Sequence, residues 1–158
     1  MVAVLENIRS VYNVGSIFRT ADGAGIEKLY LTGYTPTPKN KLGKPRKKMK
    51  KTALGATKTV QWESFDSTKR CLQNLQKENY NIITVEEGTK DAKKYTNTQA
   101  SQKENLAIVF GNEVEGISDE TLELSNKTIF IPMEGKKQSL NVAVSFGIIA
   151  YFYKDQYE

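Results

Sequence analysis

Apolar positions along the chain recur with two spacings, one typical of strands and one typical of helices. Short apolar runs that predict buried strands occur at residues 2–5, 27–33, 59–64, 81–86, 105–111 and 127–133. Helical spacing predicts helices at about 13–24, 66–79 and 118–124, and a last helix of about 15 residues from Ser139. Strands that alternate with helices predict an α/β fold: a mostly parallel sheet with helices on both faces.

The first of these helices shows the pattern most clearly. Its apolar side chains have the i, i+3, i+4, i+7 spacing of one helix face: Val14, Ile17, Phe18 and Ala21. Asn13 is placed to cap the helix. Arg19 falls on the polar side, where an exposed pair with Asp22 would account for it without any function.

The chain length and the terminal helix bear on organisation. With 158 residues and no repeat or linker, residues 1–158 are expected to form a single domain. Residues 34–51 hold three of the four prolines and predict one long loop. The terminal helix, 139–155, is apolar nearly all round and therefore needs cover on more than one side. A second copy of the chain is a sensible cover, which favours a homodimer.

Positive charge is concentrated in one segment. The net charge is +5, but residues 39–51 contain eight of the 23 basic residues and no acid, which leaves 15 basic residues against 18 acidic ones elsewhere. A mildly acidic body with one basic segment favours a polyanionic partner. A solvated, flexible loop or a nuclear-localisation signal are the alternatives.

Several kinds of chemistry are disfavoured by composition. The chain has no histidine and one cysteine, so a zinc or copper site and a serine-hydrolase triad are not expected. Cys71 lies in an amphipathic segment and is predicted to be a buried thiol, which fits a reducing cytoplasm. Gly23 and Gly25 follow a helix and do not form a dinucleotide fingerprint. No apolar run reaches the roughly 18 to 20 residues of a membrane span.

Two more clusters place glycines and polar side chains after predicted strands. In "VFGNEVEGIS", residues 109–118, Gly111 and Gly116 bracket a strand-end loop, where glycines permit close approach to a ligand. In "IPMEGKKQSLNVAVSFGIIAYF", residues 131–152, a strand leads through a glycine loop to Ser139 and Asn141. Taken singly, the first could be a plain turn and Ser139 a plain helix cap.

Together the three clusters resemble the three motifs of the SpoU (TrmH-like) branch of the SPOUT RNA methyltransferases. The matched positions, in the family's order, are Asn13, Gly15 and Arg19, then Gly111, Glu113 and Gly116, then Pro132, Met133, Gly135, Ser139, Leu140 and Asn141. Each motif alone is weakly specific, whereas three in order across nearly the whole chain are highly specific.

This resemblance implies a fold, a cofactor and a partner. The C-terminal part of an α/β sheet would be threaded into a trefoil knot, which general topology rules alone would not suggest. The cofactor would be S-adenosyl-L-methionine, bound by Gly111, Glu113, Gly116, Ile131, Met133, Ser139 and Leu140. Members act as homodimers, with the terminal helix in the interface.

The implied reaction is methyl transfer to a ribose 2′-hydroxyl of tRNA or rRNA in the cytoplasm, with no metal. The resemblance assigns its catalytic residues to Arg19, Asn13, Glu113, Ser139 and Asn141. Because a guanidinium stays protonated, Arg19 is expected to hold an RNA phosphate and stabilise the developing alkoxide, not to remove a proton. The expected RNA contacts are Arg9, Lys41, Lys44, Arg46, Lys47, Lys48, Lys50 and Lys51.

Two alternatives remain at this stage. A non-catalytic RNA-binding protein that retains the SPOUT fold would bind RNA but no cofactor. A base-methylating SPOUT relative is disfavoured, because the "SLNV" run at residues 139–142 resembles the ribose branch. The sequence does not identify the RNA or the nucleotide.

Overall fold

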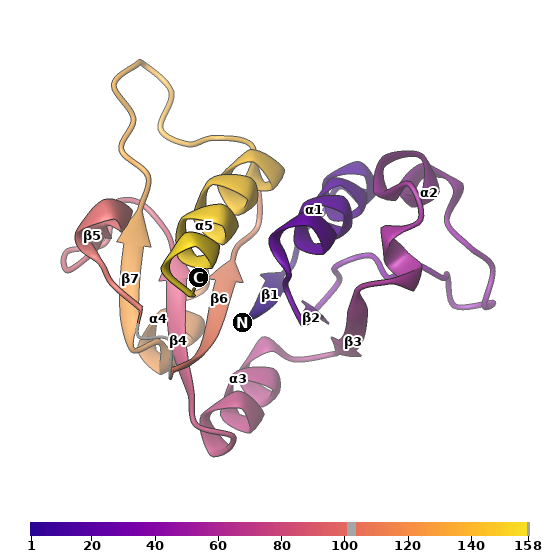
Figure 1. The fold of residues 1–158 in the computed structure, drawn as a ribbon, viewed down its shortest axis with the longest axis horizontal. Coiled ribbons are helices and arrows are strands. Elements are labelled where there is room, and N and C mark those ends of the chain that lie inside the picture. The colour runs from indigo at the N-terminus through magenta and orange to yellow at the C-terminus, as the bar shows by residue number, and fades with distance from the viewer. Residues whose placement is uncertain (101–103, 158) are drawn as a thin grey trace.

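The computed structural model describes residues 1–100 and 104–157 of the chain. These residues contain a seven-stranded sheet in the order β3-β2-β1-β6-β4-β7-β5, with every pair of neighbours parallel (Figure 1). The strands are β1 Val2–Glu6, β2 Lys28–Thr32, β3 Gln61–Phe65, β4 Tyr80–Val85, β5 Lys93–Lys94, β6 Asn105–Phe110 and β7 Lys127–Phe130. The predicted parallel α/β architecture is therefore confirmed.

Helices cover both faces of this sheet. They are α1 Val11–Ala24, α2 Lys47–Ala53, α3 Thr68–Lys77, α4 Asp119–Leu124 and α5 Val142–Tyr157, with 3₁₀ turns at Ala56–Lys58 and Tyr95–Asn97. On one face the core includes side chains of α1, α2 and α5, and on the other it includes those of α3. None of the helices in the described part of the chain has the length and apolarity needed to span a bilayer.

Alternation along β1 shows how the sequence forms this three-layer arrangement. Ala3 and Leu5 pack on the α1 and α5 side, and Val2 and Val4 pack on the α3 side, because successive strand residues point to opposite faces. All five residues of β1 are buried, as expected of a central parallel strand covered on both faces.

The topology places three loops at one edge of the sheet. The carboxyl ends of parallel strands meet at the same edge, so the loops that follow β1, β6 and β7 all lie there. The chain continues in opposite directions from β1 to β2 and from β6 to β7, which makes the β1–β6 boundary a topological switch point. Ligands of open α/β sheets bind at such points.

The first helix begins earlier than predicted. Ser10, not Asn13, is its N-cap, since the Ser10 hydroxyl accepts the Asn13 N–H at 3.2 Å. The expectation that Asn13 caps this helix was wrong, because Ser10 has the extended backbone of a cap and Asn13 lies inside the first turn. The Asn13 side chain is thereby available for other contacts.

The predicted loop over 34–51 is only partly a loop. Its last five residues belong to α2, which buries Met49 and Ala53, at i and i+4, against α1. Gly15 allows this close packing: a Cβ there would lie 2.0 Å from Thr52 Oγ1. The dense lysines concealed the helix, because only one apolar residue interrupts them before Ala53.

The terminal helix begins at Val142, three residues later than predicted. Asn141 precedes it, and its side-chain oxygen accepts the Ala143 N–H at 2.9 Å. Ser139 therefore does not begin the helix. Cys71 on α3 is fully buried, as predicted, and desolvation raises the pKa of its thiol to about 12.

Candidate functional site

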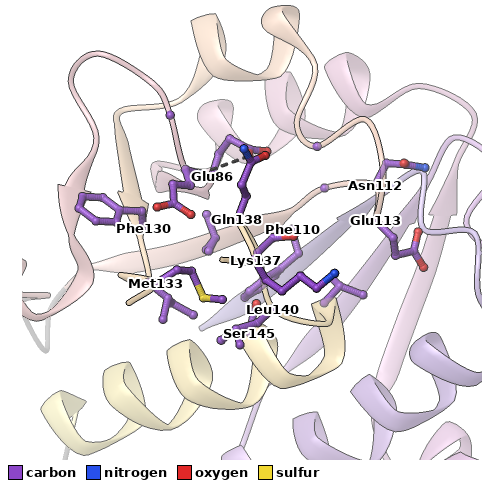
Figure 2. Close-up of a pocket in the computed structure, with 18 of the residues that line it drawn as sticks. Glu86, Phe110, Asn112, Glu113, Phe130, Met133, Lys137, Gln138, Leu140 and Ser145 are labelled. Carbon is purple, nitrogen blue, oxygen red and sulfur yellow. Dashed lines mark hydrogen bonds between the residues drawn. The ribbon is translucent and has the colours of Figure 1, made fainter. Parts of the chain in front are cut away.

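A pocket of about 650 Å³ opens at the carboxyl ends of β4, β6 and β7 (Figure 2). Its walls come from residues 85–88, 110–116 and 130–140 and from the start of α5. Its floor includes Phe110, and Met133, Lys137, Leu140 and Ser145 are drawn around the same space (Figure 2). A volume of this size is typical of small-molecule and cofactor sites.

The loop after β6 is closed on itself by backbone hydrogen bonds. Asn112 and Gly116 exchange two N–H to carbonyl bonds of 3.0 Å each. A Cβ at Gly111 would lie 2.5 Å from the Gly116 backbone carbon, and Gly116 has φ +71° with the Glu86 carboxylate close by. Both glycines are thus required by the geometry of the loop, which lets its backbone line the pocket.

Glu113 joins this loop to the segment after β1. Its carboxylate accepts the backbone N–H of Arg9 at 2.9 Å and of Ser10 at 3.1 Å, and the Asn13 side-chain amide at 3.0 Å. Partial burial acts to raise the pKa of Glu113, but these hydrogen bonds and one from its own N–H outweigh it and lower the pKa. A carboxylate held in this way is a positioning group and a poor proton acceptor.

Asn141 completes a connection among all three motifs. The Asn141 side-chain amide donates to Asn13 Oδ1 at 3.1 Å, while Asn13 Nδ2 donates to Glu113. Residues separated by 128 and 100 positions in the sequence are therefore linked by two hydrogen bonds at the edge of the sheet.

The segment after β7 forms the opposite wall. Ile131, Met133 and Leu140 are half-buried and line the pocket, whereas Ser139 is exposed and lines it from the loop. The seven residues expected to bind a cofactor, Gly111, Glu113, Gly116, Ile131, Met133, Ser139 and Leu140, all line this one pocket. Their roles remain predictions.

Arg19 is not brought into the pocket. It is exposed on α1 and lines a separate hollow with Ser16, Thr20 and Gly23 of α1, Lys51 and Thr52 of α2, and Tyr151 of α5. It does not pair with Asp22, whose carboxylate accepts the Thr59 hydroxyl at 2.6 Å. Within one chain, Arg19 is thus separated from the loops that carry Glu113 and Ser139.

The basic segment is folded and exposes its charges. Asn40 Oδ1 accepts the N–H groups of Leu42 and Lys44, and Arg46 Nε donates to the Thr37 carbonyl at 3.0 Å. Apart from half-buried Arg46, the expected RNA contacts, including Arg9, are exposed. Among the described residues, none of these cations forms a salt bridge.

Two carboxylates and one lysine at the ends of strands or in the loops after them were missed by sequence reasoning. Glu86 lines the pocket and accepts the Ile117 N–H at 2.7 Å, and Lys137 lines it from the loop after β7. Glu6, which is buried, accepts hydrogen bonds from the N–H and hydroxyl of Ser118. Glu6 and Glu86 end or follow predicted strands, and that position was the available signal.

Metal ligation finds no support in the described ranges, 1–100 and 104–157. No group of three or more His, Cys, Asp or Glu side chains there is arranged to hold a metal ion. The polar groups at the pocket are backbone amides, side-chain carboxylates and amides, lysines and the hydroxyls of Ser139 and Ser145.

The pocket lies at the carboxyl edge of a parallel sheet, beside its topological switch point. The protein is therefore an α/β protein with a ligand site at the position usual for open α/β sheets. The model of the SpoU rRNA Methylase family matches residues 1–151, and the chain belongs to that family. The resemblance seen in the three motifs is confirmed.

Three relatives illustrate the comparison. The chain is 32% identical over 148 residues to the 23S rRNA (guanosine-2'-O-)-methyltransferase RlmB of Escherichia coli K12, covering 94% of this chain and 57% of that protein. The A. aeolicus TrmH/SpoU tRNA modifying enzyme superposes with TM-score 0.83 at 28% identity, over 98% of this chain and 74% of the other. The chain thus spans little more than half the length of the curated relatives it matches.

The third relative shows the fold alone. The SpoU methyltransferase AviRb from Streptomyces viridochromogenes, solved in complex with the cofactor AdoMet, superposes with TM-score 0.84 at 21% identity, over 99% of this chain and 60% of the other. The overall fold is therefore that of known SpoU enzymes.

Proposed function

We propose that this protein transfers a methyl group from S-adenosyl-L-methionine to a ribose 2′-hydroxyl of tRNA or rRNA. The observation that carries the proposal is the hydrogen-bonded connection Asn141–Asn13–Glu113, which joins the three motifs of a SpoU family member beside one pocket. One relative is named as acting on rRNA and another as acting on tRNA, so the proposal includes both kinds of RNA.

The pocket fits the proposed cofactor in size and chemistry. It combines apolar side chains such as Met133 and Leu140 with the backbone of the 111–116 loop and with charged side chains. An adenosyl group needs apolar contact and backbone hydrogen bonds, and an amino-acid moiety needs charged or polar partners. When bound, the cofactor would supply an electrophilic methyl group on its sulfonium. The seven pocket residues predicted from the motifs would hold it.

The chain's own residues would then orient the reacting hydroxyl. Positioning alone can contribute about 7–11 kcal/mol to such a reaction. In our proposal, Glu113 fixes the segment after β1, while Asn13, Asn141 and Ser139 position the ribose and the loops. Arg19, which stays protonated, would bind a phosphate and stabilise negative charge on the attacking oxygen.

We propose that a homodimer completes the site. Val144, Ile148 and Tyr151 lie at i, i+4 and i+7 on α5, and Val144 and Tyr151 remain 51% and 43% exposed. Tyr151 also lines the hollow that contains Arg19. An interface through the 139–155 segment would cover these three side chains. It would also place Arg19 near the pocket of the other subunit.

Further parts of the proposal rest on family membership. The 131–141 segment and α5 would form the trefoil knot of the SPOUT fold. Residues 1–158 would form a single SPOUT domain. The protein would meet its RNA in the cytoplasm. The exposed cations of 39–51 and Arg9 would bind RNA phosphates, which fix position without reading sequence.

Titration calorimetry with S-adenosyl-L-methionine separates the enzyme from its alternative. The proposal expects saturable binding that is weakened when Leu140, a half-buried pocket residue, is replaced by Asp. A non-catalytic RNA-binding protein would bind RNA and give no heat with the cofactor. Mapping of 2′-O-methyl sites in RNA from cells with and without the gene would then identify the nucleotide, and identical maps would refute the proposed reaction.

A further inference from the structure

Tyr34 presents an aromatic ring to solvent next to the proposed catalytic loops. It follows β2 and is 58% exposed; among the tyrosines whose exposure the structure describes, Tyr12 and Tyr151 are also exposed, at 45% and 43%. A tyrosine that contributed to the core would bury its ring, since the apolar area removed from water is its main stabilising contribution. Tyr34 leaves most of that area in water.

Tyr34 is nevertheless held by hydrogen bonds at its backbone and at its hydroxyl. The Tyr34 backbone N–H donates to Asn7 Oδ1 at 3.2 Å, and its phenolic oxygen accepts Asn112 Nδ2 at 2.8 Å. The same Asn112 amide group donates to the Asn7 carbonyl at 2.8 Å. Two asparagines from other strand-end loops therefore fix the position of one tyrosine.

The backbone around Tyr34 is shaped for this arrangement. Asn7 has φ 53° and Gly33 has φ 62°, both in the left-handed region. A Cβ at Gly33 would lie 1.9 Å from Asn7 Oδ1, so a glycine is required there. Thr35, which follows, is buried and hydrogen-bonded through its hydroxyl to Ile8 N and Leu5 O. The ring projects from a rigid turn.

The surroundings of the ring indicate what it would bind. Asn112, which holds the Tyr34 hydroxyl, lies between Gly111 and Glu113 in a loop that lines the pocket. Exposed Arg9 has its backbone bonded to Glu113, and the basic segment 39–51 follows Tyr34 closely in the chain. Exposed aromatic faces and exposed cations on one protein are the combination by which proteins bind single-stranded nucleic acid.

We propose that the Tyr34 ring stacks on an unpaired base of the RNA substrate, next to the nucleotide whose ribose faces the cofactor pocket. This inference rests on the proposed function and adds to it that the substrate is single-stranded at the site. A base inside a duplex has both faces covered, so only an unpaired base can reach the ring. Tyrosine suits the task because it offers a large rigid face and loses little conformational entropy.

Fluorescence of a short single-stranded RNA that contains 2-aminopurine tests the proposal, because stacking quenches this base. The wild-type protein should quench it, and Tyr34→Ala should abolish the quenching and weaken binding about five- to 150-fold, the range for loss of one base–aromatic stack. Tyr34→Phe retains the ring and should stay within about threefold of wild type, on the same principle. Tyr34→Leu has similar bulk without the aromatic face and should resemble Tyr34→Ala.

A titration of each variant with S-adenosyl-L-methionine accompanies the RNA measurement, and unchanged cofactor affinity should show that the pocket loop is intact. The inference is overturned if Tyr34→Ala or Tyr34→Leu binds RNA as the wild type does. It is equally overturned if Tyr34→Phe loses RNA and cofactor binding together, since the hydroxyl bond would then explain the residue. A wild-type protein that binds neither cofactor nor RNA would instead refute the proposed function.

Discussion

The region around the pocket and the basic segment differ in whether their polar side chains are bonded within the chain. At the edge of the pocket, Glu113, Asn13 of α1 and Asn141 bond to one another and to backbone, so their positions are fixed within the chain. In the segment 39–51 the cations other than half-buried Arg46 are exposed, and none of them forms a salt bridge within the described residues. The first region is organised before any partner arrives, whereas the second leaves its charges for a polyanion.

Arg19 is exposed like the cations of the basic segment, although the other residues of its motif lie in the organised region. It shares a helix with Asn13, yet it is exposed in a hollow whose other polar residues, Ser16, Thr20, Lys51, Thr52 and Tyr151, include no acid. The comparison therefore predicts different consequences for substitutions in the two regions: loss of organisation in the pocket, and loss of partner binding or catalysis elsewhere.

The largest effect is expected for Arg19→Ala. If Arg19 stabilises charge in the transition state, this change should lower the methylation rate about 100- to 1,000-fold. Cofactor affinity should stay nearly unchanged, because Arg19 does not line the pocket. Methyl transfer to total RNA and calorimetry measure the two quantities. Arg70→Ala removes an exposed arginine from α3 and is the matched control, with full activity expected. Comparable activity of both variants would contradict the role of Arg19.

Salt should affect RNA binding far more than cofactor binding. If about five of the basic-segment charges contact phosphates, log affinity should fall with log salt at a slope near −3.5 on the single-strand rule, so that a fourfold rise in salt costs about 100-fold in affinity. Fluorescence anisotropy across a salt series gives the slope. Replacing Lys47, Lys48 and Lys50 by Ala should reduce its magnitude by about 2. A slope near zero would show that the basic segment does not bind the phosphates.

Glu113→Gln tests the organised region. The amide of glutamine would direct N–H groups at donors that now point to a carboxylate, which should destabilise the fold by about 1–3 kcal/mol and weaken cofactor binding. The pKa of Glu113 is lowered in the folded state from its ordinary 4.5. The stabilisation from Glu113 is therefore complete above about pH 4.5 and is lost as the pH falls through the lowered folded-state value.

Thermal unfolding of wild type and Glu113→Gln across this acidic range measures the effect. The difference between their melting temperatures should be largest at neutral pH and should shrink as the pH falls below 4.5. Glu115→Gln, an exposed neighbour in the same loop, serves as the control. A constant difference at all pH values would contradict the hydrogen-bonded carboxylate.

The last effect is expected on stability alone and concerns the packing of α2 on α1. Gly15→Ala places a methyl group 2.0 Å from Thr52 Oγ1 and 2.8 Å from the Met49 carbonyl. The resulting overpacking should destabilise the protein by about 1–3 kcal/mol. Gly147→Ala, another helical glycine, meets its nearest neighbour at an ordinary 3.7 Å and should be neutral or stabilising by up to about 1 kcal/mol. Denaturant unfolding compares them, and equal stabilities would rule out the tight helix contact.

Local patterns of apolar residues predicted the fold, because most of its strands and helices have such a pattern in their own sequence. The alternation of apolar runs with helical spacing was enough for the parallel sheet and its covering helices. The helix α2 was missed because it is held by Gly15 and by burial of Met49 between lysines, and these are long-range contacts. The cap was misplaced because Ser10 and Asn13 are both good caps, and only the backbone angles distinguish them.

The candidate site was predictable only as far as sequence motifs extend. Glycine and asparagine positions indicated strand-end loops, and the pocket gathers all seven predicted cofactor residues. The separation of Arg19 from that pocket depends on which side of α1 faces α5, which no motif encodes. Glu86 and Asn112 act through bonds to distant loops, and such partners are visible only in three dimensions.

Methyl transfer from isotopically labelled S-adenosyl-L-methionine into purified total tRNA and rRNA, followed by digestion to nucleosides, tests the central claim most directly. The account predicts label in 2′-O-methylribonucleosides of at least one RNA class, incorporated about 100- to 1,000-fold more slowly in the Arg19→Ala reaction. Label confined to methylated bases, or no label in any RNA although the cofactor binds, would contradict it.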